Sequence, residues 1–77
     1  MHMRVLVKVN GEYIAEEVVL AKYVPFEDKL VITTATAFYE ISLSETTGKA
    51  AMKDLVSSGY YDFSGYKATI MKRGGRA

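Results

Sequence analysis

The stretch RVLVKVNGEYIAEE, residues 4–17, decides the fold of this chain. Its first six residues alternate between valine and other side chains, which is the period of a strand with one buried face. Asn10-Gly11 follows directly, and this pair favours a type I′ turn because both residues tolerate a positive φ. We therefore predict a β-hairpin over these residues, with its valines facing the core.

The register of this hairpin places Arg4 opposite Glu17. The same register places Val5, on the buried face, opposite the charged Glu16. Because a buried face does not accept an unpartnered charge without cost, we expect a bulge or a bend near Glu16–Glu17.

The segment Glu12–Val24 has a second interpretation, as a helix. Asn10 could cap it, and its glutamates lie towards its start, where anions are favourable. Its β-branched and aromatic residues Val18, Val19 and Tyr23 favour a strand instead. The helical interpretation would imply a ferredoxin-like βαββαβ fold.

Residues 25–43 are predicted to form a turn and two strands. Pro25–Asp28 indicates the turn, because proline cannot donate to a sheet. We expect strands at Leu30–Thr34 and Phe38–Leu43, interrupted around Thr34–Ala37, because a single strand is usually about 5–6 residues long. One long bent strand remains the alternative, since no typical turn residue marks the interruption. The expected buried face of the second strand consists of Tyr39, Ile41 and Leu43.

The clearest helix is predicted at Thr47–Ser58. Thr46 or Thr47 can cap its start, and Gly59 stands where a left-handed C-cap belongs. A helix with one apolar stripe packs that stripe on a sheet. The stripe consists of Ala51, Met52, Leu55 and Val56.

The remaining residues complete a predicted α+β fold. Tyr66–Met71 alternates as a last strand, and Lys72–Ala77 is expected to be a flexible basic tail. Residues 1–77 are taken as one small domain, in which Met1-His2 is expected to be a cloning scar. The fold is then an antiparallel β-meander of three or four strands, with one helix packed on the sheet and a C-terminal strand.

The composition excludes several kinds of chemistry. The chain has no cysteine, which excludes disulfides, thiol catalysis and thiolate metal sites. Its one histidine, His2, belongs to the expected scar, so imidazole catalysis and histidine-bound metals are not expected. We expect no enzymatic activity, no cofactor and no metal. A domain this small without cross-links relies on its core or on oligomerisation, which favours a homodimer.

Hydropathy gives a further expectation about location. No apolar run approaches the roughly 18 residues that span a bilayer, and the first residues alternate as a strand rather than forming a signal peptide. We therefore expect a cytoplasmic protein with no membrane contact.

Two motifs are similar to functional sites and do not match them. Gly48-Lys49 follows the pattern of a phosphate-binding loop, but Leu43 stands in place of its first glycine and Ala50 in place of its last hydroxyl residue. The pairs Glu16-Glu17 and Glu27-Asp28 hold adjacent carboxylates, which point to opposite faces in a strand. We expect the start of a helix and solvated charges, respectively.

An aromatic cluster follows the predicted helix, and its members are Tyr60, Tyr61, Phe63 and Tyr66. We expect Tyr60 and Phe63 to complete the core, and Tyr61 and Tyr66 to be more exposed. Because tyrosine is enriched at interaction hot spots, the four residues are the predicted partner-binding site. Other tyrosines would join this surface if their strands are neighbours: Tyr13, Tyr23 and Tyr39.

Nucleic-acid binding is the competing hypothesis. Tyrosine rings next to cations could stack on single-stranded bases and contact phosphates. The cations concerned are Lys67, Lys72, Arg73 and Arg76. The net charge of +1 provides no general attraction to nucleic acid. The leading hypothesis is therefore a small non-enzymatic protein-interaction module, homodimeric, of the kind found in bacteria, phages and mobile elements.

Overall fold

The computed structural model describes residues 2–72, and only the backbone of Lys72. Within these residues the chain forms seven strands, one α-helix and one short 3-10 helix. Their bounds are β1 Arg4–Val9, β2 Glu12–Glu17, β3 Leu20–Val24, η1 Pro25–Glu27, β4 Lys29–Thr33, β5 Ala37–Ser42, α1 Glu45–Ser58, β6 Tyr60–Asp62 and β7 Ala68–Lys72.

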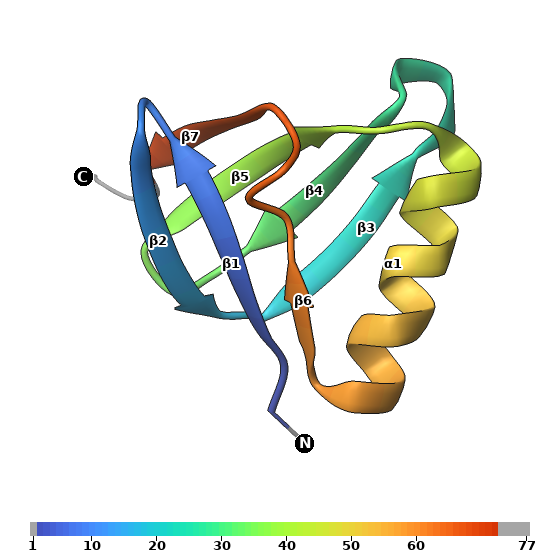
Figure 1. Cartoon of the computed structure of the whole chain (residues 1–77), viewed down its shortest axis with the longest axis horizontal. Coiled ribbons are helices and arrows are strands. Elements are labelled where there is room, and N and C mark those ends of the chain that lie inside the picture. Colours follow the sequence, from blue (N-terminus) through green and yellow to red (C-terminus); the bar gives the residue numbers. More distant parts are fainter. Residues whose placement is uncertain (1, 73–77) are drawn as a thin grey trace.

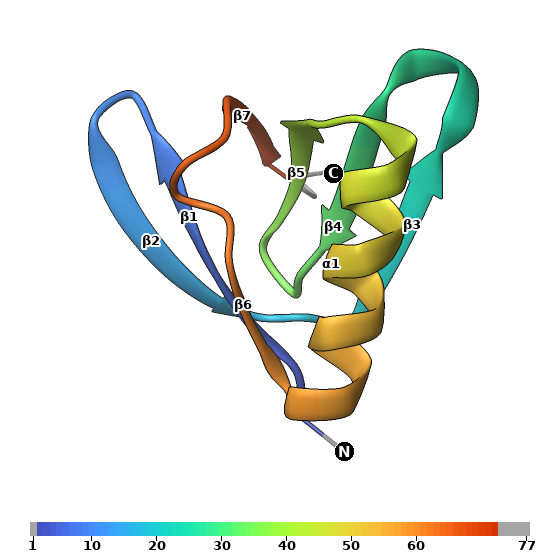
Figure 2. The ribbon, with the colours of Figure 1, turned by 45° about the vertical axis from the view of Figure 1, so that its right-hand side comes forward.

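The strands form two sheets rather than one (Figure 1). Sheet A has the order β2-β1-β6, in which β1 and β2 are antiparallel and β6 is parallel to β1. Sheet B has the antiparallel order β3-β4-β5-β7. Figure 2 shows the two sheets diverging as two layers, with α1 beside β3 and β6. The α+β prediction is confirmed, and the ferredoxin-like alternative is wrong because Glu12–Val24 forms strands β2 and β3.

The β1–β2 hairpin has the predicted turn and register. Asn10 and Gly11 have φ values of 52° and 84°, as a type I′ turn requires. Pairing is regular from Arg4↔Glu17 onward and includes Val5↔Glu16, so the predicted bulge is wrong. The sheet accepts Glu16 at this position because its carboxylate accepts a hydrogen bond of 2.8 Å from the Tyr39 hydroxyl.

The chain passes from one sheet to the other at Val18–Val19. The Val18 amide donates to the Met3 carbonyl beside sheet A, at 2.7 Å, and the Val19 amide donates to the Thr33 carbonyl of sheet B, at 2.8 Å. Val18 is buried and Val19 is exposed. This bend divides the predicted meander into two layers, and it follows directly after the position where the sequence indicated one.

The turns of sheet B agree with the sequence. Pro25–Glu27 forms a 3-10 turn, which ends at Asp28 with a left-handed φ of 49°. The interruption between β4 and β5 is a tight loop in which the Thr34 hydroxyl accepts hydrogen bonds from the Thr36 and Ala37 amides. The alternative of one long bent strand is therefore wrong.

Helix α1 begins two residues before the predicted start. Its cap is Ser44, whose side chain accepts from the Thr47 amide, rather than Thr46 or Thr47. Gly59 ends the helix with a φ of 78°, as predicted. The stripe is narrower than predicted, because Val56 is 55 % exposed. The described residues contain no helix long and apolar enough to cross a membrane.

One hydrophobic core fills the space between the two sheets and α1. The valines of β1 and the alternating face of β5 are buried, as predicted. The core consists of Val5, Val7, Val9, Val18, Leu30, Ile32, Ala37, Tyr39, Ile41, Leu43, Ala51, Leu55 and Phe63. The outer faces of both sheets carry exposed side chains, and binding surfaces can be sought there.

Candidate interaction surface

The four rings of the aromatic cluster divide between core and surface. Phe63 is 0 % exposed and Tyr60 is 50 % exposed, while Tyr61 and Tyr66 are partly buried against the core. The cause is the alternation along β6: Tyr61 lies beside Val5 and faces inward, so Tyr60 faces outward. The expectation that Tyr60 completes the core is wrong, and the one for Phe63 is confirmed. The expectation that Tyr61 and Tyr66 are the more exposed rings is also wrong, because both are more buried than Tyr60 and pack against the core.

Tyr61 and Phe63 form one packed unit. Their ring centroids are 4.5 Å apart, with the planes tilted by 46°, a geometry that is favourable for aromatic pairs. Burial is the main cause that raises the pKa of the Tyr61 hydroxyl, and electrostatic repulsion from Tyr66 raises it further. These two rings hold β6 against the core, which leaves Tyr60 as the most exposed ring of the cluster.

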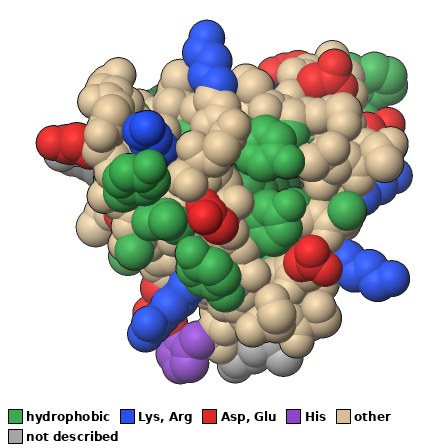
Figure 3. All heavy atoms as spheres, viewed as in Figure 1, with side chains coloured by type: hydrophobic (Ala, Val, Ile, Leu, Met, Phe, Trp, Pro, Cys, Tyr) green, Lys and Arg blue, Asp and Glu red, His purple; other side chains and the backbone are tan. Residues whose placement is uncertain are grey.

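Tyr60 shares the outer face of sheet A with a second exposed tyrosine. Tyr13 of β2 is 64 % exposed and points to the same side of the sheet, two strands away. Figure 3 shows apolar side chains, cations and carboxylates interspersed on the side of the molecule that sheet A faces. We call these outward residues the sheet A face: Arg4, Leu6, Lys8, Tyr13, Ala15, Glu17, Tyr60 and Asp62.

The sheet A face is ordered in cross-strand rows. Arg4 lies between Glu17 and Tyr60, and Leu6 lies between Ala15 and Asp62. The Lys8 ammonium lies 5.2 Å from the centroid of the Tyr13 ring, a cation–π arrangement. The rings therefore stand at opposite edges of the sheet with charges between them.

The charges of the sheet A face balance. Its two cations, Arg4 and Lys8, are matched in number by two carboxylates, Glu17 and Asp62. Glu17 also contacts the His2 ring. Hydrogen bonds from Ser64, including one of 2.8 Å from its amide, lower the pKa of Asp62 and keep it ionised. A balanced face does not have the excess of cations that a phosphate backbone selects.

The residues predicted for nucleic-acid contact are not brought onto this face by the described structure. Lys67 is exposed, and its carbonyl accepts from the Ser42 amide of sheet B, at 2.9 Å. The Lys72 backbone ends β7 in the same sheet. The Lys72 side chain, Arg73 and Arg76 lie outside the described residues.

The other tyrosines do not join the surface. Tyr39 is 1 % exposed, and burial followed by the Glu16 carboxylate raises its pKa to about 12. Its hydroxyl ties β5 of sheet B to β2 of sheet A through Glu16, which also accepts from the Thr36 hydroxyl at 3.3 Å.

A hollow of about 240 Å³ lies at the C-terminal end of β2, and it is lined by Arg4, Ala15, Glu16 and Glu17.

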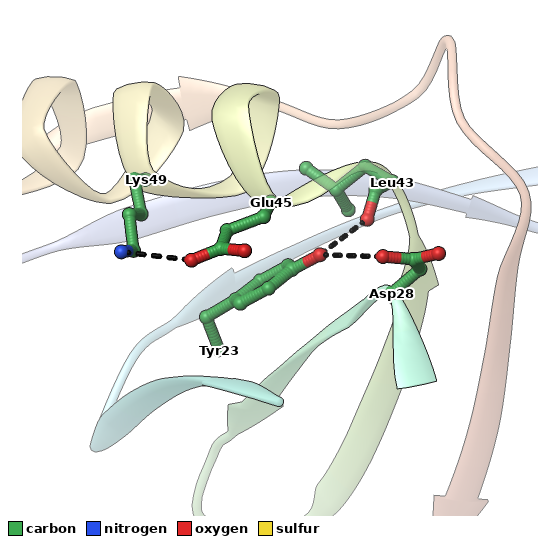
Figure 4. A network of polar contacts seen from close by, with 5 residues as sticks. All are labelled: Tyr23, Asp28, Leu43, Glu45 and Lys49. Carbon is green, nitrogen blue, oxygen red and sulfur yellow. Dashed lines mark hydrogen bonds and ion pairs between the residues drawn. The ribbon is translucent and has the colours of Figure 1, made fainter. Parts of the chain in front are cut away.

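Tyr23 of β3 packs against the first turns of α1, and Figure 4 shows its polar contacts. Its hydroxyl lies 3.0 Å from the Leu43 carbonyl and 3.3 Å from an Asp28 carboxylate oxygen. Burial and then Asp28 raise its pKa. Its ring lies so close to Gly48 that a Cβ there would meet two ring carbons at 2.5 Å. The glycine of the Gly48-Lys49 pair thus makes room for a ring.

Lys49 and the carboxylates of the adjacent acidic pairs, Glu16-Glu17 and Glu27-Asp28, also form contacts within the chain. Lys49 pairs with Glu45 one turn earlier, at 2.9 Å (Figure 4). Lys29 lies 2.8 Å from Glu27 and 3.2 Å from Glu40, and these two carboxylates raise its pKa. The described residues contain no group of three side chains suited to hold a metal ion.

Sequence reasoning missed most of the sheet A face. The sequence indicates Tyr13 as a surface residue only if its strand neighbours the aromatic cluster, and it gives no reason to assign Arg4 or Leu6 to a binding surface. The hairpin register already placed Arg4 opposite Glu17, but the parallel pairing of β1 with β6 joins residues far apart in the chain. Comparison with known protein families, curated proteins and solved structures found no significant match.

Proposed function

We propose that this protein is a non-enzymatic interaction module that binds another protein through the sheet A face. The observation that carries the proposal is that Tyr13 and Tyr60 both point outward from the same side of sheet A, at 64 % and 50 % exposure. Tyrosine supplies a large, rigid contact area with a polar tip and is enriched among the residues that dominate binding energy.

The surroundings of the two rings fit a protein partner. Arg4 is paired across the strands with Glu17 and Tyr60, and arginine is the charged residue that is favoured at hot spots. Leu6 gives the centre of the face an apolar contact. Interspersed charges of both signs suit the polar rim of a protein interface.

A binding role rather than a catalytic one also fits the hydrogen bonds of the buried and partly buried polar side chains, which hold the fold together. The best-defined hydrogen bonds of Tyr23, Tyr39 and Glu16 connect one element of the fold to another. We further propose a cytoplasmic homodimer, of the kind found among accessory proteins of bacteria, phages and mobile elements. Its 77 residues and lack of cysteine support this part, since a small domain without disulfides gains stability by association.

Site-directed photo-crosslinking in cells tests the proposal. A benzophenone amino acid at position 60 or 13 should give one discrete crosslinked protein, identified by mass spectrometry. The matched control is position 56 on α1, where Val56 is 55 % exposed and no crosslink to that protein is expected. Arg4→Ala in the same chain should weaken the crosslink, since loss of a hot spot of 1–2 kcal/mol lowers affinity about tenfold.

Two outcomes would contradict the proposal. Equal crosslinking from positions 56 and 60 would mean that the sheet A face is not selective. Crosslinks only to a second copy of the chain would make this face the homodimer contact instead.

Single-stranded nucleic-acid binding is the alternative. One observation favours it, because Tyr13, Tyr60, Arg4 and Lys8 share the same face. Binding of a labelled oligonucleotide at about 50 mM salt, where phosphate contacts are strong, would support it if Tyr60→Ala abolished the binding. No binding at that salt would leave the protein partner as the better proposal.

A further inference from the structure

Strand β2 is the edge strand that is left uncovered within the described residues. Each sheet has two edge strands, and three of these four lie beside another element: β6 and β3 lie beside α1, and β7 lies beside β1. The main neighbour of β2 within residues 2–72 is β1, and Figures 1 and 2 both show β2 at the outer margin of the molecule. An uncovered edge can pair with a further strand, which is why folded proteins usually cover or shorten their edges.

The hydrogen bonds around the hairpin show which backbone groups of β2 face outward. The Val18 amide donates to the Met3 carbonyl, so these two residues form a hydrogen-bonded pair, and every second pair along the ladder does the same. The Leu6 carbonyl belongs to the pairs in between, and it accepts from the Phe63 amide on the β6 side, at 2.7 Å. On β2, the residues of these intermediate pairs turn their amides and carbonyls away from β1: Tyr13, Ala15 and Glu17.

We propose that an extended basic segment of a partner protein binds as a further strand, antiparallel to β2, at the free edge of sheet A. Its backbone pairs with the outward amides and carbonyls of Tyr13, Ala15 and Glu17, in the manner of peptides that add to exposed sheet edges. Donors and acceptors recur at every second residue of an extended chain, so one strand matches the whole row. The inference rests on the proposed function, because it takes the partner to be a protein, and it adds the edge and the kind of segment that binds there.

The charge of β2 selects a basic segment. The two cations of sheet A, Arg4 and Lys8, belong to β1 and lie one strand further from the edge. Opposite charges across two strands are favourable and like charges are unfavourable. The edge therefore favours lysine and arginine over a phosphate backbone, and over a second copy of β2, which would add its own carboxylates. The carboxylates of β2 are Glu12, Glu16 and Glu17.

The side chains of sheet A specify where the segment is apolar. Leu6 and Ala15 stand side by side in one row of the outer face, and a segment residue opposite Ala15 extends this row. The hollow of about 240 Å³ that Ala15 helps to line lies at this position, so an aliphatic side chain has room there. The next residue of the segment points to the other side of the sheet, beside the partly buried Ile14, and is apolar as well.

An NMR titration of the purified protein with the capped peptide Arg-Lys-Leu-Val-Thr-Lys tests the proposal. In the antiparallel register its first residue lies opposite Glu17 and its last opposite Glu12, so its cations meet the glutamates and its leucine meets Ala15. We expect saturable shifts of the three edge amides, those of Tyr13, Ala15 and Glu17. The dissociation constant should be roughly 0.1–1 mM, because a short flexible peptide loses entropy when it becomes ordered.

Two N-methylated peptides distinguish strand pairing from attraction by charge. The leucine amide of the peptide donates to the Ala15 carbonyl in the proposed register, whereas the valine amide faces away from β2. N-methylation of the leucine should weaken binding about tenfold, because it removes a hydrogen bond and keeps the two backbones apart. N-methylation of the valine should change binding much less. Glutamate in place of the three cations of the peptide should abolish binding.

A substitution at the centre of the edge tests the same pairing from the side of the protein. Ala15→Pro removes an amide that faces away from β1, so the hairpin loses no hydrogen bond, and edge strands accept proline at such positions. Ala15→Pro should weaken peptide binding about tenfold. The matched control is Ala15→Ser, which keeps the amide and a small side chain and should bind like the wild type. Circular dichroism spectra that match the wild type show that both variants fold.

Three results would overturn the proposal. The first is that no edge amide shifts at about 5 mM peptide, where even a weak complex forms. The second is equal binding of the two N-methylated peptides, which would show attraction by charge alone. The third is a shift of the edge amides with protein concentration in the absence of peptide, which would make a second copy the occupant.

Failure of strand addition can be told apart from failure of the proposed function. A peptide that does not bind leaves a selective crosslink from position 60 in place, so the sheet A face would still bind its partner without strand addition. Equal crosslinking from positions 56 and 60 beside intact peptide binding would contradict the sheet A face alone.

Discussion

The two sheets have similar inner faces and contrasting outer faces. Inside, both contribute alternating apolar residues to one core. Outside, sheet A separates Tyr13 and Tyr60 with balanced charges, whereas sheet B aligns Leu20, Phe38 and Met71 in one row. The contrast shows that strand alternation specifies which side chains enter the core, and that it does not constrain the composition of the outer face of each sheet.

The largest effect is expected from a substitution in the core that the two sheets share. Phe63 is 0 % exposed and packs on Tyr61. Phe63→Ala should lower the free energy of unfolding by about 3–5 kcal/mol, because the truncated ring leaves a cavity. Urea denaturation measures the change. Equal stability of Phe63→Ala and wild type would mean that the ring does not belong to the core, and both outer faces would need a new account.

A second test separates α1 from sheet B at Gly48. Gly48→Ala should destabilise by about 1–2 kcal/mol, because the overpacking against Tyr23 exceeds the gain of about 1 kcal/mol in helix propensity. Thermal unfolding measures the change.

The matched control for Gly48→Ala is Gly65→Ala, where a Cβ meets nothing within 4 Å. This variant should be neutral or slightly stabilising, since alanine restricts the unfolded chain. Stabilisation by Gly48→Ala as well would show that Tyr23 does not lie against the helix.

A third test uses pH to remove the hydrogen bond between Tyr39 of sheet B and Glu16 of sheet A. The pKa of Tyr39 is raised to about 12 in the folded protein, so its contribution is complete below the unfolded value of about 10. It is lost as the pH rises from about 10 through 12, by about 1–2 kcal/mol once solvent at the Glu16 end is allowed for. Urea denaturation at a series of alkaline pH values measures this loss.

The control for the pH test is Tyr39→Phe, which should lose stability at neutral pH and show a smaller alkaline decline. Some decline should remain, because the pKa values of Tyr23 and Tyr61 are also raised. An unchanged alkaline decline in Tyr39→Phe would exclude the Tyr39–Glu16 bond as its source.

The smallest effect is expected at the outer face of sheet A itself. Tyr60→Ala should change the free energy of unfolding by no more than about 0.5 kcal/mol, because exposed substitutions rarely do more. Chemical denaturation of Tyr60→Ala beside Phe63→Ala would sharpen the division of the aromatic cluster. A loss of several kcal/mol in Tyr60→Ala would place that ring in the core after all.

The local parts of the fold could be predicted from sequence, and the long-range parts could not. Asn10-Gly11 and Gly59 specify their turns through backbone φ, and the valines of β1 specify an inner face. The division into two sheets depends on hydrogen bonds from Val18 and Val19 to residues elsewhere in the chain. Local periodicity carries no information about such partners.

The candidate surface was harder to predict than the fold for the same reason. Four rings in seven residues were visible in the sequence, but which ring faces outward depends on the parallel register of Tyr61 with Val5. Tyr13 joins Tyr60 only because β1 pairs on both sides. The row from Leu20 to Met71 requires three registers at once, so it could be recognised only in the folded chain.

The central claim is that the outer face of sheet A, and not that of sheet B, binds another protein. Its most direct test is one pair of substitutions at similarly exposed positions, Tyr13→Glu on sheet A and Leu20→Glu on sheet B, each assayed for crosslinking to another protein from position 60. We expect Tyr13→Glu to lose the crosslink and Leu20→Glu to keep it. If Leu20→Glu abolished the crosslink in a folded protein, or Tyr13→Glu left it unchanged, the claim would be contradicted.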